Sequence, residues 1–494
     1  MKILIALLVL LALGAGVSWY AAGRAPGPVV ALAAPQKAIG QSSELTVLVD
    51  TPAGKLKSLD VALEQGSTHV PVFSLAGTGA AQLVQDGAHR VRLSRAIGKR
   101  EIPQLIAGQA RITVTASRSV LFGLREVATT VSRDLEVRLT PPTVAALSSF
   151  QYVNQGGSEM IVYRVSPADV TSGVRVGDHE YPGFPAAGAH IAAADPGLRV
   201  AFFALLWNQD SSTPISLYAR DDVGNEAHAT FDYRVFPKSF RESRIPIDDH
   251  FLAKVVPPIL ANSPELKVAD PSDLLAAFLR INGELRRENG ATIAALAHET
   301  EPQILWQGPF RQLVNTAVEA GFADQRAYVY KGQVVDHQVH LGFDLASVSG
   351  APVLAANRGK VVHAGWLGIY GNCVILDHGM GVQSLYAHLS AIEVKVGDMV
   401  SENQPLGRTG STGLAGGDHL HFTMLLGGNA VTPIDWWSAK WVADRIDRKL
   451  HDAGATPDSA APVQAAGSVT PPRAATPARH RHRAHAAASR QASR

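Results

Sequence analysis

Short runs of alternating and β-branched residues fill much of this chain, and they constrain its fold more than any other feature. Runs such as LTVLVD, HRVRLS and ARITVTAS are each bounded by Gly, Asn, Asp, Ser or Pro. Strands of this length at such a spacing are typical of β-sandwiches. A second set of runs follows the sequence TPPT. We therefore expect a mainly β chain with two N-terminal β-sandwich modules, over residues 43–140 and 141–237.

The stretch that follows the second module has a helical pattern. In DPSDLLAAFLRINGELRRENG, Asp270 is placed to cap a helix, Pro271 to occupy its first position and Gly290 to follow its end. A second helix is expected between Gly290 and Glu301. These signals predict a helical connector over residues 238–304.

The C-terminal third returns to β patterning with many glycines. GKVVHAGW, GNCVILDHG and VQSLYAHLS predict a β domain over residues 305–441, followed by a short helix over 442–453. Residues 454–494 contain six Arg, one Asp and little apolar bulk, so we expect a disordered basic tail. Near the other end, Pro and Ala dominate residues 25–42, which we interpret as a linker.

The charge balance gives no reason to expect a specific nucleic-acid partner. Lys and Arg number 45 against 43 Asp and Glu, for a net charge of +2. The basic tail has the charge to bind an anionic wall polymer, a membrane surface or nucleic acid, but a solvated end without a partner is the simpler interpretation. Cys373 is the single cysteine, which excludes both an intrachain disulfide and a cysteine-rich zinc site. Any bound metal must therefore use His and carboxylate ligands.

The N-terminus carries an export signal. Lys2 precedes an uncharged, mostly apolar run from Ile3 to Ala22, and about 20 such residues suffice to span a bilayer. The small residues of WYAAG offer a cleavage site, so residues 1–24 are either a signal peptide or an anchor. We favour an uncleaved inner-membrane anchor, which leaves the remaining chain on the periplasmic side of a bacterial envelope. Secretion after cleavage is the alternative.

The sequence GGDHLHFTM places two histidines one residue apart. On a strand, alternate side chains share a face, so His419 and His421 point the same way. Two neutral imidazoles suit a divalent metal, or one ligand beside one group that handles a proton. Taken alone, the pair also fits two hydrogen-bonded core histidines.

A second motif, VHLGFDLA, supplies further ligand types. His340 and Asp344 would share a face of an extended strand but lie roughly 13 Å apart, so we expect Gly342 to mark a bulge or bend. His, Asp and one more His, with a fourth position for water, make the ligand set of a catalytic zinc site. No H-E-x-x-H motif provides a glutamate base, and a histidine is the substitute that titrates near neutral pH. Another histidine, His388, lies in SLYAHLS.

Several long segments, in their order, resemble a known family. HLGFDLA, the stretch GAPVLAANRGKVVHAGW to SLYAHLS, and VKVGDMVSENQPLGRTGSTGLAGGDHLHF are similar to the lysostaphin-type, or LytM-like, zinc endopeptidases that cut peptidoglycan cross-bridges. The resemblance covers roughly residues 305–437. It implies a small antiparallel, barrel-like β domain whose cleft holds one Zn²⁺ per chain. Carried over by position, the implied zinc ligands are His340, Asp344 and His421, and the implied catalytic pair is His388 and His419.

The resemblance therefore implies an exported zinc metalloendopeptidase that acts on peptidoglycan peptides. The two β modules would position the catalytic domain, dock it to an envelope protein or cover its cleft. The main alternative is a non-catalytic LytM-like activator of separate cell-wall amidases, which typically lacks metal ligands. A lipoyl-type carrier is a further alternative, because VKVGDMVSENQPLG has the rhythm of that half-barrel, but a Met-Lys-Met hairpin is missing.

The other prominent residues of this domain have simpler interpretations. Tyr386 either lines the cleft with His388 or belongs to the core. Cys373 is interpreted as a small buried hydrophobe. The remaining histidines of the domain are interpreted as structural or surface groups: His337, His363 and His378. Four glycines are interpreted as a loop before the expected catalytic strand: Gly410, Gly413, Gly416 and Gly417.

Overall fold

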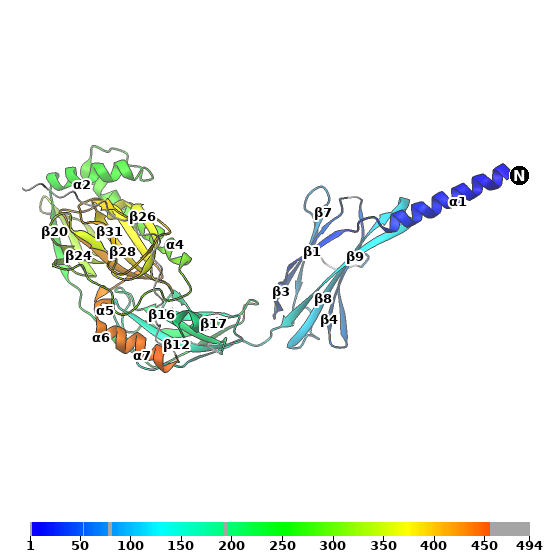
Figure 1. The fold of residues 1–494 in the computed structure, drawn as a ribbon, viewed down its shortest axis with the longest axis horizontal. Coiled ribbons are helices and arrows are strands. Elements are labelled where there is room, and N and C mark those ends of the chain that lie inside the picture. The colour runs from blue at the N-terminus through cyan, green and yellow to red at the C-terminus, as the bar shows by residue number, and fades with distance from the viewer. Residues whose placement is uncertain (1, 53, 78–81, 192–194, 455–494) are drawn as a thin grey trace, which may run out of the picture. The chain divides into compact units, whose positions relative to one another are not determined.

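The chain is mainly β, as its residue pattern predicts, and its strands form several separate sheets (Figure 1). The computed structural model describes residues 2–52, 54–77, 82–191 and 195–454. The tail predicted to be disordered, residues 454–494, lies outside the described residues except for Gly454.

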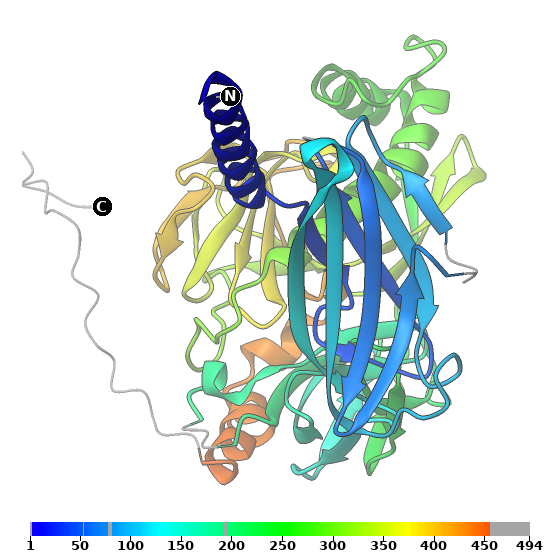
Figure 2. The same cartoon turned by 90° about the vertical axis from the view of Figure 1, so that its right-hand side faces the viewer.

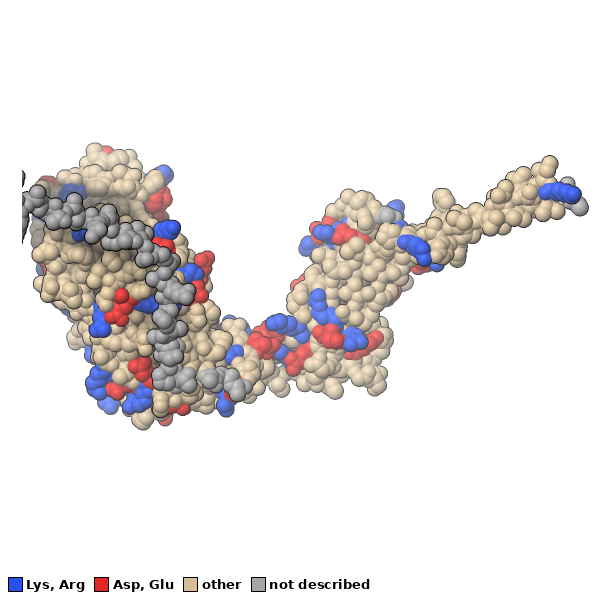
Figure 3. All heavy atoms as spheres, in the orientation of Figure 1, with Lys and Arg blue, Asp and Glu red and all other residues tan. Residues whose placement is uncertain are grey.

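The first element is a long apolar helix, α1 (Lys2–Gly23). Its 22 residues, at about 1.5 Å each, extend roughly 33 Å, which is enough to cross the hydrocarbon core of a bilayer. Its mean hydropathy reaches 2.3, and none of the residues in that window is buried against protein. Figure 3 shows the helix without charge along its length, apart from basic side chains at its two ends. A membrane anchor and a signal sequence both have these properties.

The first module consists of two sheets. Their facing side chains form one core, to which Leu45 and Val47 contribute from one sheet and Ile112 and Val114 from the other. Figure 2 shows the long strands of the second sheet side by side, in blue and cyan. In pairing order the first sheet contains β1 (Val29–Ala34), β3 (Ser43–Asp50), β7 (Arg90–Ile97) and β6 (Gln82–Gln85), and the second contains β2 (Ala38–Ile39), β9 (Arg125–Val137), β8 (Gly108–Val120), β4 (Leu56–Gln65) and β5 (Thr68–Ser74).

The interpretation of residues 25–42 as a linker is wrong in part, because Val29–Ala34 and Ala38–Ile39 form strands. Val29–Ala34 forms β1, which pairs antiparallel with β3 from Val29 opposite Asp50 onward. The sequence VVALAA contains enough β-branched and apolar residues to form an edge strand. The Pro and Ala residues around it made the segment resemble a linker.

The second module has the same general construction. The strands at Ile215–Arg220 and Glu226–Ala229 pair as a hairpin around Asp222–Asn225, where Gly224 has a φ of 85°. One sheet contains, in pairing order, β10 (Thr143–Ala146), β12 (Ser158–Ser166), β16 (Leu198–Ala204) and β15 (Phe184–Pro185). The other contains β14 (His179–Pro182), β13 (Thr171–Val176), β17 (Ile215–Arg220) and β18 (Glu226–Ala229). A separate pair is formed by β11 (Gln151–Asn154) and β19 (Tyr233–Phe236).

The connector is helical, but its helices begin and end elsewhere than predicted. Asp273, not Asp270, caps α3 by accepting a hydrogen bond from Ala276 N, while the carboxylate of Asp270 accepts from Ser272 in a preceding turn. Gly290 lies inside α4 and ends no helix. The elements are β20 (Glu242–Ile247), α2 (Asp249–Asn262), α3 (Leu274–Arg280), the π-helical η3 (Ile281–Leu285), α4 (Arg286–Leu296) and η4 (Ala297–Glu299).

The C-terminal β domain is built on one large antiparallel sheet. Three neighbouring strands of its centre, β24, β32 and β28, carry or adjoin the predicted site residues. The sheet contains β21 (Ala317–Ala320), β24 (Phe343–Ala346), β32 (Leu420–Leu426), β28 (Val382–Leu389), β27 (Asn372–Asp377), β26 (Gly359–Trp366) and β30 (Met399–Val400) in that order, with β33 (Asn429–Val431) on β32. In a second sheet, β22 (Asp324–Tyr330) lies between β20 and β23 (Gln333–His340) and pairs with both. A third sheet contains β25 (Pro352–Leu354), β31 (Pro405–Arg408) and β29 (Ala391–Ile392).

An aromatic cluster joins the second module to this domain in one continuous core. Phe202 of β16 lies 6.4 Å from Trp306 and 6.0 Å from Trp436, measured between ring centroids. Trp436 is in α5 (Pro433–Trp437), and its indole nitrogen donates a hydrogen bond to Ser158 of β12. The second module and the C-terminal domain are therefore packed as one body.

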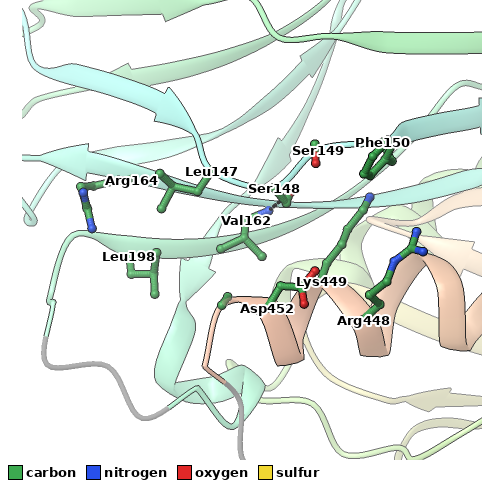
Figure 4. Close-up of a pocket in the computed structure, with 11 residues that line it drawn as sticks. Leu147, Ser148, Ser149, Phe150, Val162, Arg164, Leu198, Arg448, Lys449 and Asp452 are labelled. Carbon is green, nitrogen blue, oxygen red and sulfur yellow. Dashed lines mark hydrogen bonds between the residues drawn. The ribbon is translucent and has the colours of Figure 1, made fainter.

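The last helices extend this packing. They are α6 (Ala439–Val442), η6 (Ala443–Asp447) and α7 (Arg448–Asp452). The ammonium of Lys449 donates to Glu159 and to the carbonyl of Met160, each at 2.8 Å, and both charged side chains are buried. Figure 4 shows Lys449 reaching from α7 towards the strands of the second module, beside a cavity of about 270 Å³. None of the predicted site residues lines that cavity.

Candidate metal centre

Strand register and one bend bring the predicted ligands together. Asp344 on β24 lies directly opposite His421 on β32. His340 ends β23, and the chain turns through residues 341 and 342 before β24 begins, so the bend expected at Gly342 is present. A β-carbon at Gly342 would lie 2.5 Å from Nε2 of His421. A glycine is therefore required where this turn passes the imidazole.

Three ligand atoms face one another at this point. Nε2 of His340 lies 2.9 Å from Oδ1 of Asp344 and 3.0 Å from Nδ1 of His421, and the last two atoms are 3.0 Å apart. The two imidazoles are buried, and the Asp344 side chain is 13% exposed. These atoms form a triad of one carboxylate and two histidines that could hold a metal ion.

The hydrogen bonds on the far side of each ring assign its tautomer. Nδ1 of His340 lies 3.0 Å from the carbonyl of Gly321, so it carries the hydrogen. Thr423 gives its hydroxyl hydrogen to the carbonyl of Leu341 and therefore accepts one from Nε2 of His421. The lone pairs of both imidazoles then face each other beside a carboxylate, which is an arrangement that a cation stabilises.

The triad fits a tetrahedral zinc ion in donor type and in size. Two imidazole nitrogens and one carboxylate oxygen are usual protein ligands of catalytic zinc, at about 2.0–2.2 Å, which corresponds to roughly 3.4 Å between ligand atoms. The observed separations of 2.9 to 3.0 Å are a few tenths of an ångström shorter. A small outward movement of the side chains would accommodate the ion.

Electrostatics favour the metal-binding protonation states. Burial opposes the charge of Asp344, but the adjacent His340, together with His419 and His421, favours that charge and holds the pKa of the carboxyl well below its ordinary value. Burial lowers the pKa of His421 to about 4. At neutral pH the carboxylate is therefore ionised and this imidazole is neutral, as ligation requires.

Arg326 fixes the second oxygen of the Asp344 carboxylate. Its Nη2 donates to Oδ2 of Asp344 and its Nε donates to Oδ2 of Asp324, each at 3.2 Å. Asp324 is itself buried and accepts a hydrogen bond from Ser243 at 2.7 Å. Arg326 thus leaves Oδ1 as the atom that faces the histidines. Arg326 was not identified from the sequence, where DQRAYVY shows a basic residue in a β-branched and aromatic run but not its partner.

Two further histidines approach the triad from its other side. His388 and His419 have ring centroids 4.9 Å apart, and the His388 ring lies 5.7 Å from that of His421. Nδ1 of His388 lies 2.8 Å from the carbonyl of Thr412, and Nδ1 of His419 lies 3.0 Å from that of Gly417. Both Nδ1 atoms carry hydrogen in these bonds, so each ring keeps an unprotonated Nε2 for another partner when neutral. Nε2 of His419 lies 3.5 Å from Oδ1 of Asp344.

The backbone at His388 explains why the side chain of Tyr386 does not lie in the cleft beside that of His388. His388 has a φ of 63°, which interrupts the alternation of a regular strand. Tyr386 is 1% exposed, its hydroxyl accepts a hydrogen bond from Ala356 N, and its ring packs on Phe422. It is a core residue rather than a cleft residue. A different aromatic side chain, Tyr370, lies 5.7 Å from the His421 ring and was not identified from the sequence.

The other histidines of the domain lie apart from the triad. His378 is fully buried between the carbonyl of Arg358 and the hydroxyl of Ser384. His363 lies 3.3 Å from the carbonyl of Gly365, and His337 is an exposed residue of β23. Cys373 is fully buried.

The glycine loop before β32 is held by backbone contacts. His419 N donates to the carbonyl of Gly410, and Leu414 N donates to that of Ile369 at 2.8 Å. Gly413 has a φ of 70°, and a β-carbon there would lie 2.4 Å from Gly371 N. Close approach between two backbone segments is thus the reason for glycine at this position.

A buried carboxylate and two imidazoles, with two more imidazoles beside them, define a candidate metal centre of the kind that hydrolases use. The family follows from the same residues. Residues 338–433 match the model of peptidase family M23, and the chain therefore carries an M23 peptidase domain. This match contains all five predicted site residues.

Curated relatives agree with that assignment. The DD-carboxypeptidase/endopeptidase Mpg of Neisseria meningitidis is 40% identical over 97 residues, which are 20% of this chain and 22% of Mpg. The peptidoglycan DD-endopeptidase ShyA of Vibrio cholerae is 28% identical over 166 residues, 34% of this chain and 36% of ShyA. The chain thus spans about a fifth to a third of the length of these relatives.

The catalytic domain of lysostaphin from Staphylococcus simulans is a related solved structure. It is 31% identical, and the match covers 26% of this chain and 98% of that one, with a TM-score of 0.24.

Proposed function

We propose that this protein is an exported zinc metalloendopeptidase that hydrolyses peptide bonds in peptidoglycan cross-links or stem peptides. The observation that carries the proposal is the convergence of His340, Asp344 and His421 on one point, with the lone pairs of both rings directed at it. The names of two relatives support the substrate class, because ShyA is named a peptidoglycan DD-endopeptidase and Mpg a DD-carboxypeptidase/endopeptidase.

One zinc ion per chain would be held by these three residues. When bound, zinc makes water acidic enough to supply hydroxide near neutral pH and polarises the carbonyl of a peptide bond. Arg326 keeps the Asp344 carboxylate oriented so that one oxygen remains available as a ligand. Gly321 and Thr423 hold the two imidazoles in the tautomers that ligation needs.

His388 and His419 supply the remaining acid–base chemistry. A hydrolytic water must lose a proton, the tetrahedral oxyanion must be stabilised, and the leaving amine must gain a proton. The two Nε2 atoms are the unprotonated imidazole nitrogens next to the triad, and their rings are held from behind by Thr412 and Gly417. We assign these steps to the two histidines as a pair.

Helix α1 and Lys2 support an envelope location. An uncleaved α1 would anchor the chain in the inner membrane with the catalytic domain in the periplasm, and cleavage would release it instead. The first module would then offer a surface for an envelope protein partner.

The test measures zinc content and cleavage on the full chain in detergent, because the peptidase domain shares its core with the second module. Wild type is compared with His421→Ala and with His363→Ala, which removes a histidine outside the triad. Zinc is quantified per chain, and cleavage is followed by new amines released from purified peptidoglycan. We expect His421→Ala to hold one zinc fewer than wild type and to lose cleavage, whereas His363→Ala retains both.

Other outcomes have defined meanings. The histidines of the tail, His480, His482 and His485, are common to all three proteins, so the difference in zinc content is the relevant quantity. Unchanged zinc and cleavage in His421→Ala would overturn the ligand assignment. Bound zinc in wild type without cleavage of any wall preparation would favour the non-catalytic amidase activator.

A further inference from the structure

The tip of the longest hairpin in the first module is apolar and exposed. Strands β8 and β9 pair over 13 residues and are joined by Leu121, Phe122, Gly123 and Leu124. Phe122 is fully exposed, at 103% of its reference area, and Leu124 is 73% exposed. A hairpin tip in water is normally built from small polar residues.

The backbone of this tip makes its composition still less expected. Leu121 and Phe122 have φ values of 53° and 58°. Consecutive positive φ values at a hairpin turn favour Asn and Gly, because a bulky side chain is strained there. Leu121 is half-buried, but Phe122 combines such a backbone with full exposure, which indicates that a surface outside the fold accounts for it.

The tip adjoins the end of the apolar helix α1. Arg125, the first residue of β9, donates a hydrogen bond to the carbonyl of Trp19 at 2.5 Å, and its guanidinium lies 5.2 Å from the centre of the Trp19 ring. A β-carbon at Gly23 would collide with the same guanidinium. The last turn of α1 and the hairpin tip are therefore in direct contact.

The residues at this contact have the composition of a membrane interface. Trp19 and Tyr20 occupy the end of α1, where aromatic side chains of spanning helices usually mark the headgroup level. Arg24 lies over the Tyr20 ring, which places it with Arg125 at the foot of the helix, where Figure 3 shows basic side chains. The nearby Glu126 is paired with Lys57, so the local excess of charge is positive.

We infer that the tip formed by residues 121–124 inserts into the same bilayer that α1 spans, in a leaflet that contains anionic phospholipid. A residue beside Trp19 lies at the depth of the aromatic belt when α1 crosses the membrane, so Phe122 and Leu124 enter the interfacial region. Arg24 and Arg125 then lie among the phosphates. This second attachment fixes the orientation of the first module on the membrane, and it is independent of the proposed peptidase activity.

The register of the sheet provides a matched control position. Glu64 of β4 pairs with Arg111 of β8, so the turn at Gly66 and Ser67 lies at the opposite end of β8 from Phe122. Thirteen residues at about 3.4 Å each separate the two ends by roughly 40 Å. Ser67 is therefore exposed on the same module but far from the inferred membrane surface.

The single buried cysteine makes the experiment selective. Because Cys373 is fully buried, a nitroxide reagent will label only an introduced surface thiol. Full chains with Phe122→Cys, Leu124→Cys or Ser67→Cys are labelled and reconstituted in nanodiscs of phosphatidylethanolamine and phosphatidylglycerol. Power-saturation electron paramagnetic resonance then compares collisions of each label with oxygen, which dissolves in lipid, and with a water-soluble nickel complex.

We expect the labels at 122 and 124 to collide preferentially with oxygen, with an oxygen-to-nickel ratio at least about fivefold higher than at 67. Replacing phosphatidylglycerol with phosphatidylcholine should lower that ratio at 122 and 124 and leave it unchanged at 67. Equal ratios at all three positions would overturn the inference. Loss of peptidase activity in any preparation would not affect the oxygen-to-nickel ratios, because label depth is measured without substrate.

Discussion

The imidazole of His421 depends on a neighbouring residue that has no side chain. Gly342 passes so close to its Nε2 that a methyl group there would displace either the ring or the turn between β23 and β24. Because that Nε2 is hydrogen-bonded to Thr423, a displaced ring would also lose the bond that fixes its tautomer.

Gly342→Ala should therefore weaken zinc binding by about 10–100-fold, the usual cost of disturbing the groups that orient a metal ligand. Gly365→Ala is the matched control, since a β-carbon at that glycine meets no atom within 4 Å. Zinc affinity is measured by competition with a chromogenic chelator. Equal affinities in the two variants would show that the turn adjusts without moving His421.

The site residues that are recognisable by their type and spacing could be predicted from the sequence. Residues that reach the site only because of how the strands are paired could not. H-x-H on a strand and H-x3-D across a glycine bend both contain the geometry that the structure displays. The contact between Arg326 and Asp344 depends on how β20, β22, β23 and β24 are placed, which no local pattern encodes. Tyr386 was ambiguous for a related reason, because the positive φ of His388 changes which side chains share a face.

At the scale of elements, α2 supports the loop that precedes β32. Lys254 donates to the carbonyl of Gly416 at 2.7 Å, and Phe251 packs in the same apolar cluster as Leu414 and Ile369. The adjacent Gly417 holds His419 through its carbonyl. The helical connector therefore helps to place one of the two proposed catalytic histidines.

Lys254→Met should loosen this loop while keeping the apolar part of the side chain. Loss of one partly exposed hydrogen bond, worth about 1 kcal/mol, predicts roughly fivefold faster amide hydrogen exchange over residues 410–417. Lys267→Met is the control, because Lys267 also donates to a carbonyl of the connector, that of Pro264, but does not contact the loop. Exchange is followed by mass spectrometry of peptides, and identical rates in both variants would contradict the supporting role of α2.

The errors in the connector have a physical explanation. Asp270 and Asp273 both have the chemistry of an N-cap, and only the path of the chain decides which carboxylate meets a free amide. Gly290 usually signals a helix end, but α4 continues to Leu296 because Ile293 packs in an apolar cluster beyond it. Tertiary packing thus overrides a local signal of about 1 kcal/mol.

At the scale of the whole molecule, the buried pair of Lys449 and Glu159 attaches α7 to the second module. The Lys449 side chain is 4% exposed and that of Glu159 is 0% exposed. An uncompensated charge in such a place is costly, although a well-packed neutral pair of similar size would not be.

Lys449→Met should lower the free energy of unfolding by about 3–5 kcal/mol, and the double variant Lys449→Met/Glu159→Gln should recover most of that loss. Lys440→Met serves as the control, because its ion pair with Asp444 is on the surface and is worth less than about 1 kcal/mol. Urea unfolding is followed by tryptophan fluorescence. A double variant as unstable as Lys449→Met would show that lost packing, rather than the buried charge, is responsible.

The two β modules and the C-terminal β domain could be recognised from local patterns, whereas their packing could not. Alternation shows that one face of a strand is buried, but it does not show which partner buries it. The continuous core around Phe202, Trp306 and Trp436 is therefore a finding of the structure alone.

That shared aromatic core has a consequence for inheritance. A recombination event that moved only the coding sequence for residues 305–441 would leave Phe202 behind and bring Trp306 and Trp436 to the surface of the transferred protein. The transplanted domain would be prone to aggregate, and selection would remove it. The segment that can pass between genes as a functional block is consequently the second module together with the peptidase domain and its closing helices.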